Sequence, residues 1–209
     1  MADGKDGSAA VIARIMKPLA YAPPYVWIFS SVMFLAYLPE FLLIGRSKPQ
    51  AGEKGDQGSL KVILLASWIG MIAGFSVAGV PAFILVRGQR VWFGLGIACL
   101  LLGALLRQHC FRTLGRYFTG DLKVVSGQSV IEAGAYRWVR HPSYTGGMLL
   151  YLGTGLALTN WLSALIITGM GVVGYAYRVM VEERALQVSL GAPYREYMRR
   201  TKRFVPYLF

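Results

Sequence analysis

Apolar runs long enough to cross a bilayer constrain this chain more than any other feature. Of its 209 residues, 55% are hydrophobic and 15% are charged, and the charges gather in a few segments. A membrane-spanning helix needs about 20 residues, and a helix satisfies its own backbone hydrogen bonds inside lipid. The sequence therefore predicts an all-α, polytopic membrane helix bundle of about five transmembrane helices in one domain, residues 1–209. The predicted spans are residues 26–44, 62–86, 91–106, 142–158 and 162–181.

Local signals refine these spans. Pro81 is predicted to kink the second span, because proline disrupts the helical hydrogen bonds. The last two spans are separated only by Thr159, Asn160 and Trp161, which predicts an antiparallel helical hairpin. Residues 111–140 are polar and basic and cannot span. Residues 8–20 are compatible with a short interfacial helix or with a frayed tail.

The basic residues predict the orientation. A net charge of +12 would suggest nucleic acid in a soluble protein, but in a membrane protein it is typical of positive-inside topology. With the loop at 45–59, the connector, the tail and the adjoining helix ends on one side, 17 of the 22 Lys and Arg lie there and 5 lie opposite. We therefore expect the N-terminus outside, the C-terminus in the cytoplasm, and membrane lipids rather than nucleic acid as partners.

The sequence also bears on the source of the protein and on metal binding. No apolar segment with a cleavage site follows the polar start, so no signal peptide is expected. The short chain without a eukaryotic targeting signal suggests a prokaryotic inner-membrane protein. Cys99 and Cys110 have neither a disulfide pattern nor metal-ligand spacing, so no metal site is predicted.

Candidate chemistry lies on the basic side, beginning where the fourth span starts. Arg140, His141, Pro142, Ser143 and Tyr144 open this span. Proline suits the first turn of a helix, where the backbone amides lack intrahelical partners and attract anions. This segment predicts either an anion site or an anchor at the membrane interface.

A second cluster lies at the end of the fifth span. Arg178 and Glu182 are four residues apart and share a helix face, and Glu183 follows. A surface ion pair is one interpretation. The other interpretation is a functional site, because ionisable groups at membrane depth tend to mark function.

Taken in order, these elements resemble the isoprenylcysteine carboxyl methyltransferase family, which is related to the membrane phospholipid methyltransferases. A Gly-Ala-Tyr-Arg-Trp-Val-Arg-His-Pro-Ser-Tyr-Thr-Gly run at residues 134–146 precedes the hairpin. Arg178, the paired Glu182 and Glu183, and then Gly191, Tyr194, Tyr197 and Pro206 follow it. The resemblance covers about residues 111–206, so residues 1–110 would be N-terminal spans and residues 111–209 the catalytic core.

The resemblance implies S-adenosylmethionine as cofactor and a lipid-like acceptor. It places Arg178 at the substrate, and Gln128 stands where the eukaryotic enzymes have histidine. Arg140 is added on physical grounds, because its charge suits the cofactor carboxylate. The predicted cofactor residues are Lys123, Gln128, Ser129, Val130, Ile131, Tyr136, Arg140, His141, Pro142, Ser143, Tyr144 and Glu182.

The sequence alone leaves open which chemical group accepts the methyl. A carboxylate is already ionised and needs a cation such as Arg178 to orient it, whereas an amine must lose a proton, for which Glu183 is the nearest candidate base. The leading prediction is carboxyl methylation. The alternatives are a phospholipid amine N-methyltransferase, an NADPH oxidoreductase like the sterol reductases, whose C-terminus resembles residues 203–207, and a non-enzymatic membrane scaffold. The oligomeric state is not predicted.

Overall fold

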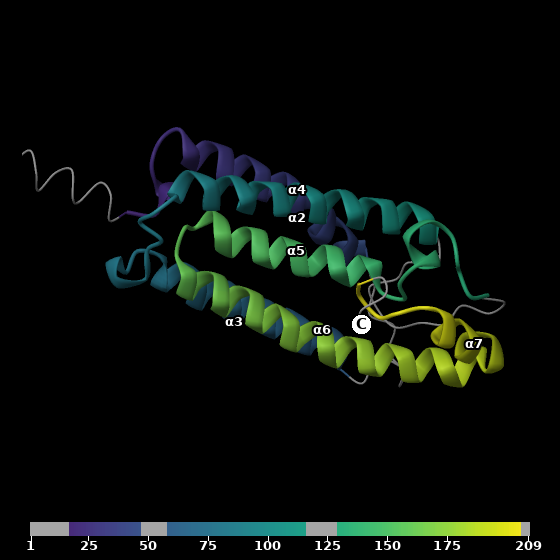
Figure 1. Ribbon diagram of the computed structural model, residues 1–209. Helices are drawn as coiled ribbons and strands as arrows, with labels where there is room; N and C mark the ends of the chain where they lie inside the picture. Colours follow the sequence, from purple (N-terminus) through teal and green to yellow (C-terminus); the bar gives the residue numbers. More distant parts are fainter. Residues whose placement is uncertain (1–16, 47–57, 116–128, 206–209) are drawn as a thin grey trace, which may run out of the picture.

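The computed structural model describes residues 17–46, 58–115 and 129–205, which form a helical bundle (Figure 1). Most of the segment predicted as an interfacial helix or tail lies outside these ranges. Within them, six α-helices and three short 3-10 turns follow one another. These are η1 (Leu19–Tyr21), α2 (Tyr25–Arg46), α3 (Ser59–Ala78), η2 (Pro81–Phe83), α4 (Gln89–Leu114), η4 (Gly134–Arg137), α5 (Pro142–Ala157), α6 (Trp161–Leu190) and α7 (Ala192–Arg200).

The bundle has the dimensions and surface of a membrane protein. Helices α2, α3, α4 and α6 are long and apolar enough to cross a bilayer. Helix α5 has 16 residues and lies between α4 and α6 along the same direction (Figure 1). Large apolar side chains such as Trp27, Leu65 and Leu105 are exposed on the outer surface, where lipid would cover them. The predicted all-α membrane bundle is confirmed, and four of the about five predicted spans are long and apolar enough to cross a bilayer within the described residues.

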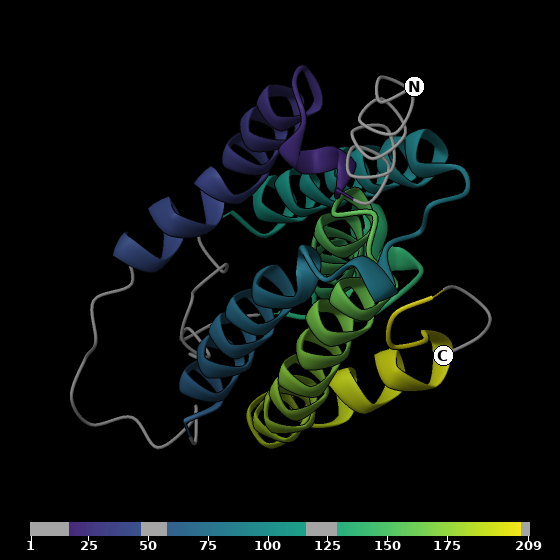
Figure 2. The ribbon, with the colours of Figure 1, turned by 90° about the vertical axis from the view of Figure 1, so that its left-hand side faces the viewer.

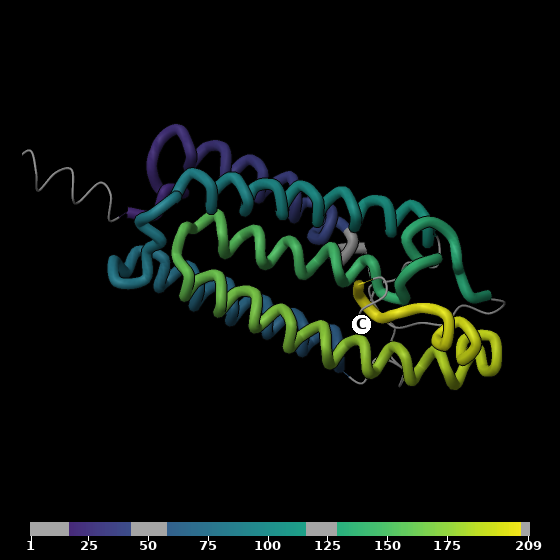
Figure 3. The backbone as a smooth tube through the Cα atoms, viewed as in Figure 1, coloured from purple at the N-terminus to yellow at the C-terminus, as the bar shows by residue number. Residues whose placement is uncertain are grey.

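Small residues set the spacing of the central helices. Helix α5 lies against α4 on one side and α6 on the other, and α3 lies against α6 (Figure 3). A Cβ added to Gly103 of α4 would lie 2.6 Å from the carbonyl oxygen of Gly146 in α5. A Cβ added to Gly74 of α3 would lie 2.3 Å from Cγ1 of Ile167 in α6. Close backbone approach therefore replaces large interlocking side chains, as is common between membrane helices. Helix α2 packs on α4 and diverges from α3 (Figure 2).

One end of the bundle is closed by the turn between α5 and α6, which confirms the predicted hairpin. Asn160 caps α6 by accepting a hydrogen bond from the Ser163 amide at 3.0 Å, and its side-chain nitrogen donates to the carbonyls of Val77 and Ala78. The Leu19 amide donates to the Thr159 hydroxyl at 3.1 Å. The starts of α3 and α5 and the ends of α2 and α4 therefore lie at the opposite end. This is the grouping of segments that the distribution of basic residues predicted.

The second predicted span is wrong at its end, and two other predicted spans are shorter than the helices that contain them. Helix α3 ends at Ala78 instead of residue 86, and Pro81 begins the separate turn η2 rather than kinking a span. Helix α4 continues past residue 106 to Leu114, and α6 continues past residue 181 to Leu190. Both helices extend because hydropathy marks where an apolar run stops, whereas a helix forms its own backbone hydrogen bonds and can continue through polar residues.

Candidate active site

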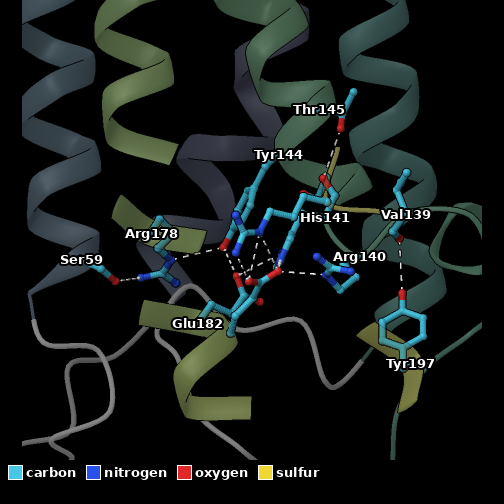
Figure 4. Close-up of polar contacts among 12 residues, drawn as sticks. Ser59, Val139, Arg140, His141, Tyr144, Thr145, Arg178, Glu182 and Tyr197 are labelled. Atoms are coloured by element: carbon cyan, nitrogen blue, oxygen red, sulfur yellow. Dashed lines mark hydrogen bonds and ion pairs between the residues drawn. The ribbon is translucent and has the colours of Figure 1, made fainter. Parts of the chain in front are cut away.

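The tail of the chain pairs with the segment that enters α5. Val139 and Lys202 form an isolated parallel bridge, and the amides of Arg140 and His141 donate to the carbonyls of Lys202 and Arg203 at 2.8 and 2.9 Å. The Tyr197 hydroxyl of α7 donates to the carbonyl of Tyr136 and to that of Val139, and Figure 4 shows the second of these contacts. Hydrogen bonds therefore hold the predicted motif and the C-terminal segment against each other, although about 60 residues separate them.

Glu183 is the electrostatic centre of this assembly. Its side chain is 4% exposed and accepts from Arg140 Nε at 2.9 Å and from Arg203 Nη2 at 2.9 Å. The His141 Nε2 atom lies 3.2 Å from Glu183 Oε1. Arg203 lies in the tail, outside the membrane-spanning segments, and its hydrogen bonds to Glu183 raise the pKa of its guanidinium. One buried carboxylate thus joins α6, the entry to α5 and the tail.

Tyr144 joins the other two charged residues of the predicted site. Its hydroxyl donates to Glu182 Oε2 at 2.5 Å and accepts from Arg178 Nε at 3.3 Å (Figure 4). Arg178 also donates from Nη1 to the Ser59 hydroxyl at 2.9 Å, at the start of α3. Arg178 is 5% exposed, whereas the Glu182 side chain is 24% exposed. Glu182 therefore lies at the edge of the cluster and Arg178 inside it.

Aromatic rings form the wall beside these charges. The His141 ring stacks on Tyr144 at a centroid distance of 5.5 Å, and Tyr144 lies 4.9 Å from Tyr175. His141 Nδ1 lies 3.8 Å from Glu182 Oε2. The N-cap and the first turn of α5 thus present a histidine and a tyrosine side by side toward the paired glutamates of α6.

The remaining predicted cofactor residues divide by position. Pro142 and Ser143 are buried in the first turn of α5, and Tyr136 is buried in η4, where burial is the main cause that raises the pKa of its phenol. Ser129, Val130 and Ile131 precede η4 and are exposed or part-exposed. Lys123 and Gln128 lie outside the described residues.

Arg140 has a different environment from the predicted one. Its guanidinium donates to Glu183 and to the carbonyls of Met198 and Thr201. These contacts fix the tail, so the expectation that Arg140 holds a cofactor carboxylate has no support from its geometry. The motif gave no sign of this, because the three partners lie more than 40 residues away.

Sequence reasoning missed a part-buried ion pair next to the site. Arg107 of α4 pairs with Glu40 of α2 through both carboxylate oxygens, and Arg107 Nη1 donates to the Ser143 carbonyl at 2.9 Å. The available signal was the presence of ionisable residues at the ends of otherwise apolar runs, which usually marks a functional or paired group.

Comparisons with known proteins agree with the motif. The model of the isoprenylcysteine carboxyl methyltransferase family matches residues 96–188, from within α4 to the last turn of α6. The resemblance predicted from the sequence is confirmed. Protein-S-isoprenylcysteine O-methyltransferase B of Arabidopsis thaliana is 32% identical over 123 residues, which are 57% of this chain and 62% of that protein. The chain thus spans just over three fifths of the length of this relative.

Two longer matches include the N-terminal helices. Protein-S-isoprenylcysteine O-methyltransferase of Tribolium castaneum is 26% identical over 199 residues, which cover 90% of this chain and 68% of that protein. A solved structure of the eukaryotic intramembrane Ras methyltransferase, isoprenylcysteine carboxyl methyltransferase, superimposes with a TM-score of 0.64 at 25% identity. That match covers 90% of this chain and 69% of the other, so the likeness to the isoprenylcysteine carboxyl methyltransferase family extends to the arrangement of the helices.

Proposed function

We propose that this protein is an integral-membrane methyltransferase that uses S-adenosylmethionine and acts on the carboxylate of an amphiphilic, lipid-like acceptor. One observation carries the proposal: His141, Tyr144 and Glu182 meet at one end of the bundle, with Arg178 joined to them through the Tyr144 hydroxyl. The likeness to isoprenylcysteine O-methyltransferases supports the reaction class.

The residues of the cluster fit the proposed cofactor. S-adenosylmethionine has ribose hydroxyls and an ammonium group that need hydrogen-bond acceptors, and the part-exposed Glu182 carboxylate offers two oxygens. Tyr144 and His141 hold Glu182 in place from the first turn of α5. Ser129, Val130 and Ile131 would contribute from the end of the connector. We propose that Lys123 and Gln128 also contribute to the cofactor site.

When bound, S-adenosylmethionine supplies a sulfonium methyl group, whose transfer to a carboxylate oxygen forms a C–O bond, breaks the S–C bond and leaves a neutral thioether. The protein's part is positioning and exclusion of water. Arg178, buried one helical turn before Glu182, would orient the acceptor carboxylate through its guanidinium. The apolar tail of the acceptor would remain in the bilayer.

The environment of Glu183 favours a carboxylate acceptor over an amine. An amine has to lose a proton, and Glu183 was the predicted base. Its oxygens are engaged by Arg140, His141 and Arg203, and a carboxylate stabilised by three such partners is a poor proton acceptor. We therefore assign Glu183 to positioning His141 and the tail. We also propose a prokaryotic inner-membrane location with this end of the bundle in the cytoplasm, where the basic residues gather.

Transfer of a heavy-isotope methyl group tests this function. Protein in liposomes is supplied with methyl-labelled S-adenosylmethionine and a farnesylated cysteine whose carboxylate is free. We expect a base-labile labelled ester, and no label on the matched substrate whose carboxylate is an amide. Arg178→Lys keeps the charge but loses the two-pronged geometry, so its turnover should fall about tenfold, equivalent to roughly 1.4 kcal/mol of transition-state stabilisation. Label on phosphatidylethanolamine nitrogen, with none on the free carboxylate, would instead identify an amine methyltransferase.

A further inference from the structure

A charged pair crosses the interior between α2 and α4, outside the cluster of His141, Tyr144 and the two glutamates. Glu40 accepts from Nε and Nη2 of Arg107, which makes the contact two-pronged. Arg107 is 7% exposed and the Glu40 side chain is 22% exposed. The guanidinium also lies over the Phe111 ring at 5.0 Å from its centroid. Both residues are therefore fixed in one geometry among apolar helices.

The remaining edge of the Arg107 guanidinium, at Nη1, contacts α5. Nη1 donates to the Ser143 carbonyl at 2.9 Å and to the Ser143 hydroxyl at 3.2 Å. Ser143 lies between His141 and Tyr144, whose rings form the wall of the candidate site. The aliphatic part of Arg107 lies against Gly146 one turn later, where an added Cβ would be 2.8 Å from Arg107 Cγ. Arg107 thus contacts α5 immediately beside the two rings of the candidate site.

Stability alone is a weak reason for this pair. Removing two charges from water costs several kcal/mol per ion, and apolar residues of similar size often stabilise such a position equally well. What apolar residues lack is direction. A guanidinium fork held by a carboxylate on one side donates along fixed lines on the other, so it determines where the Ser143 carbonyl and hydroxyl can lie.

We propose that Glu40 and Arg107 are positioning residues for the methyl-transfer site. Glu40 aims the guanidinium of Arg107, and Arg107 fixes the first turn of α5 through Ser143. The Tyr144 hydroxyl is thereby held at Glu182 and the His141 ring at both glutamates. Helix α2, which contributes no residue to the sequence motif, is in this way coupled to the site. The link to methyl transfer rests on the proposed function, whereas the fixing of α5 does not.

The Arg107→Lys substitution tests the contact with Ser143 separately from the contact with Glu40. A lysine at this position keeps a charge for Glu40 but has no second prong for Ser143. In hydrogen exchange of the whole 209-residue chain in detergent, we expect the amides of residues 144–148 to exchange at least tenfold faster, with those of α3 unchanged. Affinity for S-adenosylhomocysteine should fall by about tenfold or more. The matched control is Arg112→Lys, the same substitution at an exposed position on the same helix, which should change neither measurement.

Each outcome bears on the proposal. Exchange and affinity equal to those of Arg112→Lys would overturn it, as would faster exchange with unchanged affinity. Acceleration throughout α3 would mean general loss of structure, and the isosteric Glu40→Gln variant then decides: local acceleration in residues 144–148 supports the proposal and uniform acceleration contradicts it. If the wild-type protein does not bind S-adenosylhomocysteine, the proposed function fails, and the exchange measurement alone decides whether Arg107 fixes α5.

Discussion

Glu183→Gln is expected to lower the free energy of unfolding by about 3–5 kcal/mol, the usual result of removing one partner from a buried ion pair. The substitution preserves shape but removes the charge that Arg140 and Arg203 share. The Arg140 side chain is 9% exposed and would be left with a buried charge and no anion. Unfolding by SDS titration in mixed micelles measures the difference.

Glu196→Gln provides the control for this measurement. Glu196 pairs with Arg199 and Arg200 on the outer face of α7, and its side chain is 55% exposed. Exposed pairs contribute little, so the free energy of unfolding should change by less than about 1 kcal/mol. Equal, small effects of the two substitutions would show that the tail is not fastened to α6 through Glu183.

Gly96→Ala is expected to destabilise the bundle by about 3 kcal/mol, at the upper end of the usual effect of overpacking. A Cβ at Gly96 would lie 2.4 Å from the Ala157 nitrogen and 2.7 Å from the Gly153 carbonyl oxygen. Both contacts are backbone atoms of α5, which cannot rotate away as a side chain can. Helices α4 and α5 would therefore have to separate, and SDS titration detects the loss.

Gly94→Ala makes the same change two residues earlier on α4. No heavy atom outside the local helix lies within 4 Å of a Cβ built there, and the position is exposed. Alanine favours the helix over glycine, so the free energy of unfolding should stay equal or rise by up to about 1 kcal/mol. A similar loss in both variants would contradict close packing of α4 on α5 at Gly96.

The parts of the fold that depend on local sequence could be predicted. Uninterrupted apolar runs marked the spans, and a three-residue connection determined the hairpin of α5 and α6. Pro142 marked the first turn of α5, as its missing amide and fixed backbone angle require. The spacing of the motif also predicted that His141, Tyr144 and Glu182 belong to one site. In the structure, the Tyr144 hydroxyl and His141 Nδ1 both lie within 4 Å of Glu182 Oε2.

The parts that depend on distant partners could not be predicted. Hydropathy cannot indicate that α4 continues to Leu114 or that Arg107 meets Glu40, because the partner lies 67 residues away on another helix. The pairing of Val139 with Lys202, and with it the engagement of Arg140 by the tail, likewise follows from tertiary structure. Assignments based on residue type alone therefore gave Arg140 to the cofactor and Glu183 to proton transfer. The contacts of both residues favour structural roles.

Ligand binding to the wild-type protein tests the central claim most directly. Isothermal titration calorimetry in detergent would compare S-adenosylhomocysteine with NADPH, and Glu182→Ala with the wild type. We expect saturable binding of the adenosyl ligand, no binding of NADPH, and a loss of about 1–3 kcal/mol of binding free energy in Glu182→Ala, because an acceptor for buried donors is removed. Binding of NADPH without a response to S-adenosylhomocysteine would contradict the account and support the reductase alternative.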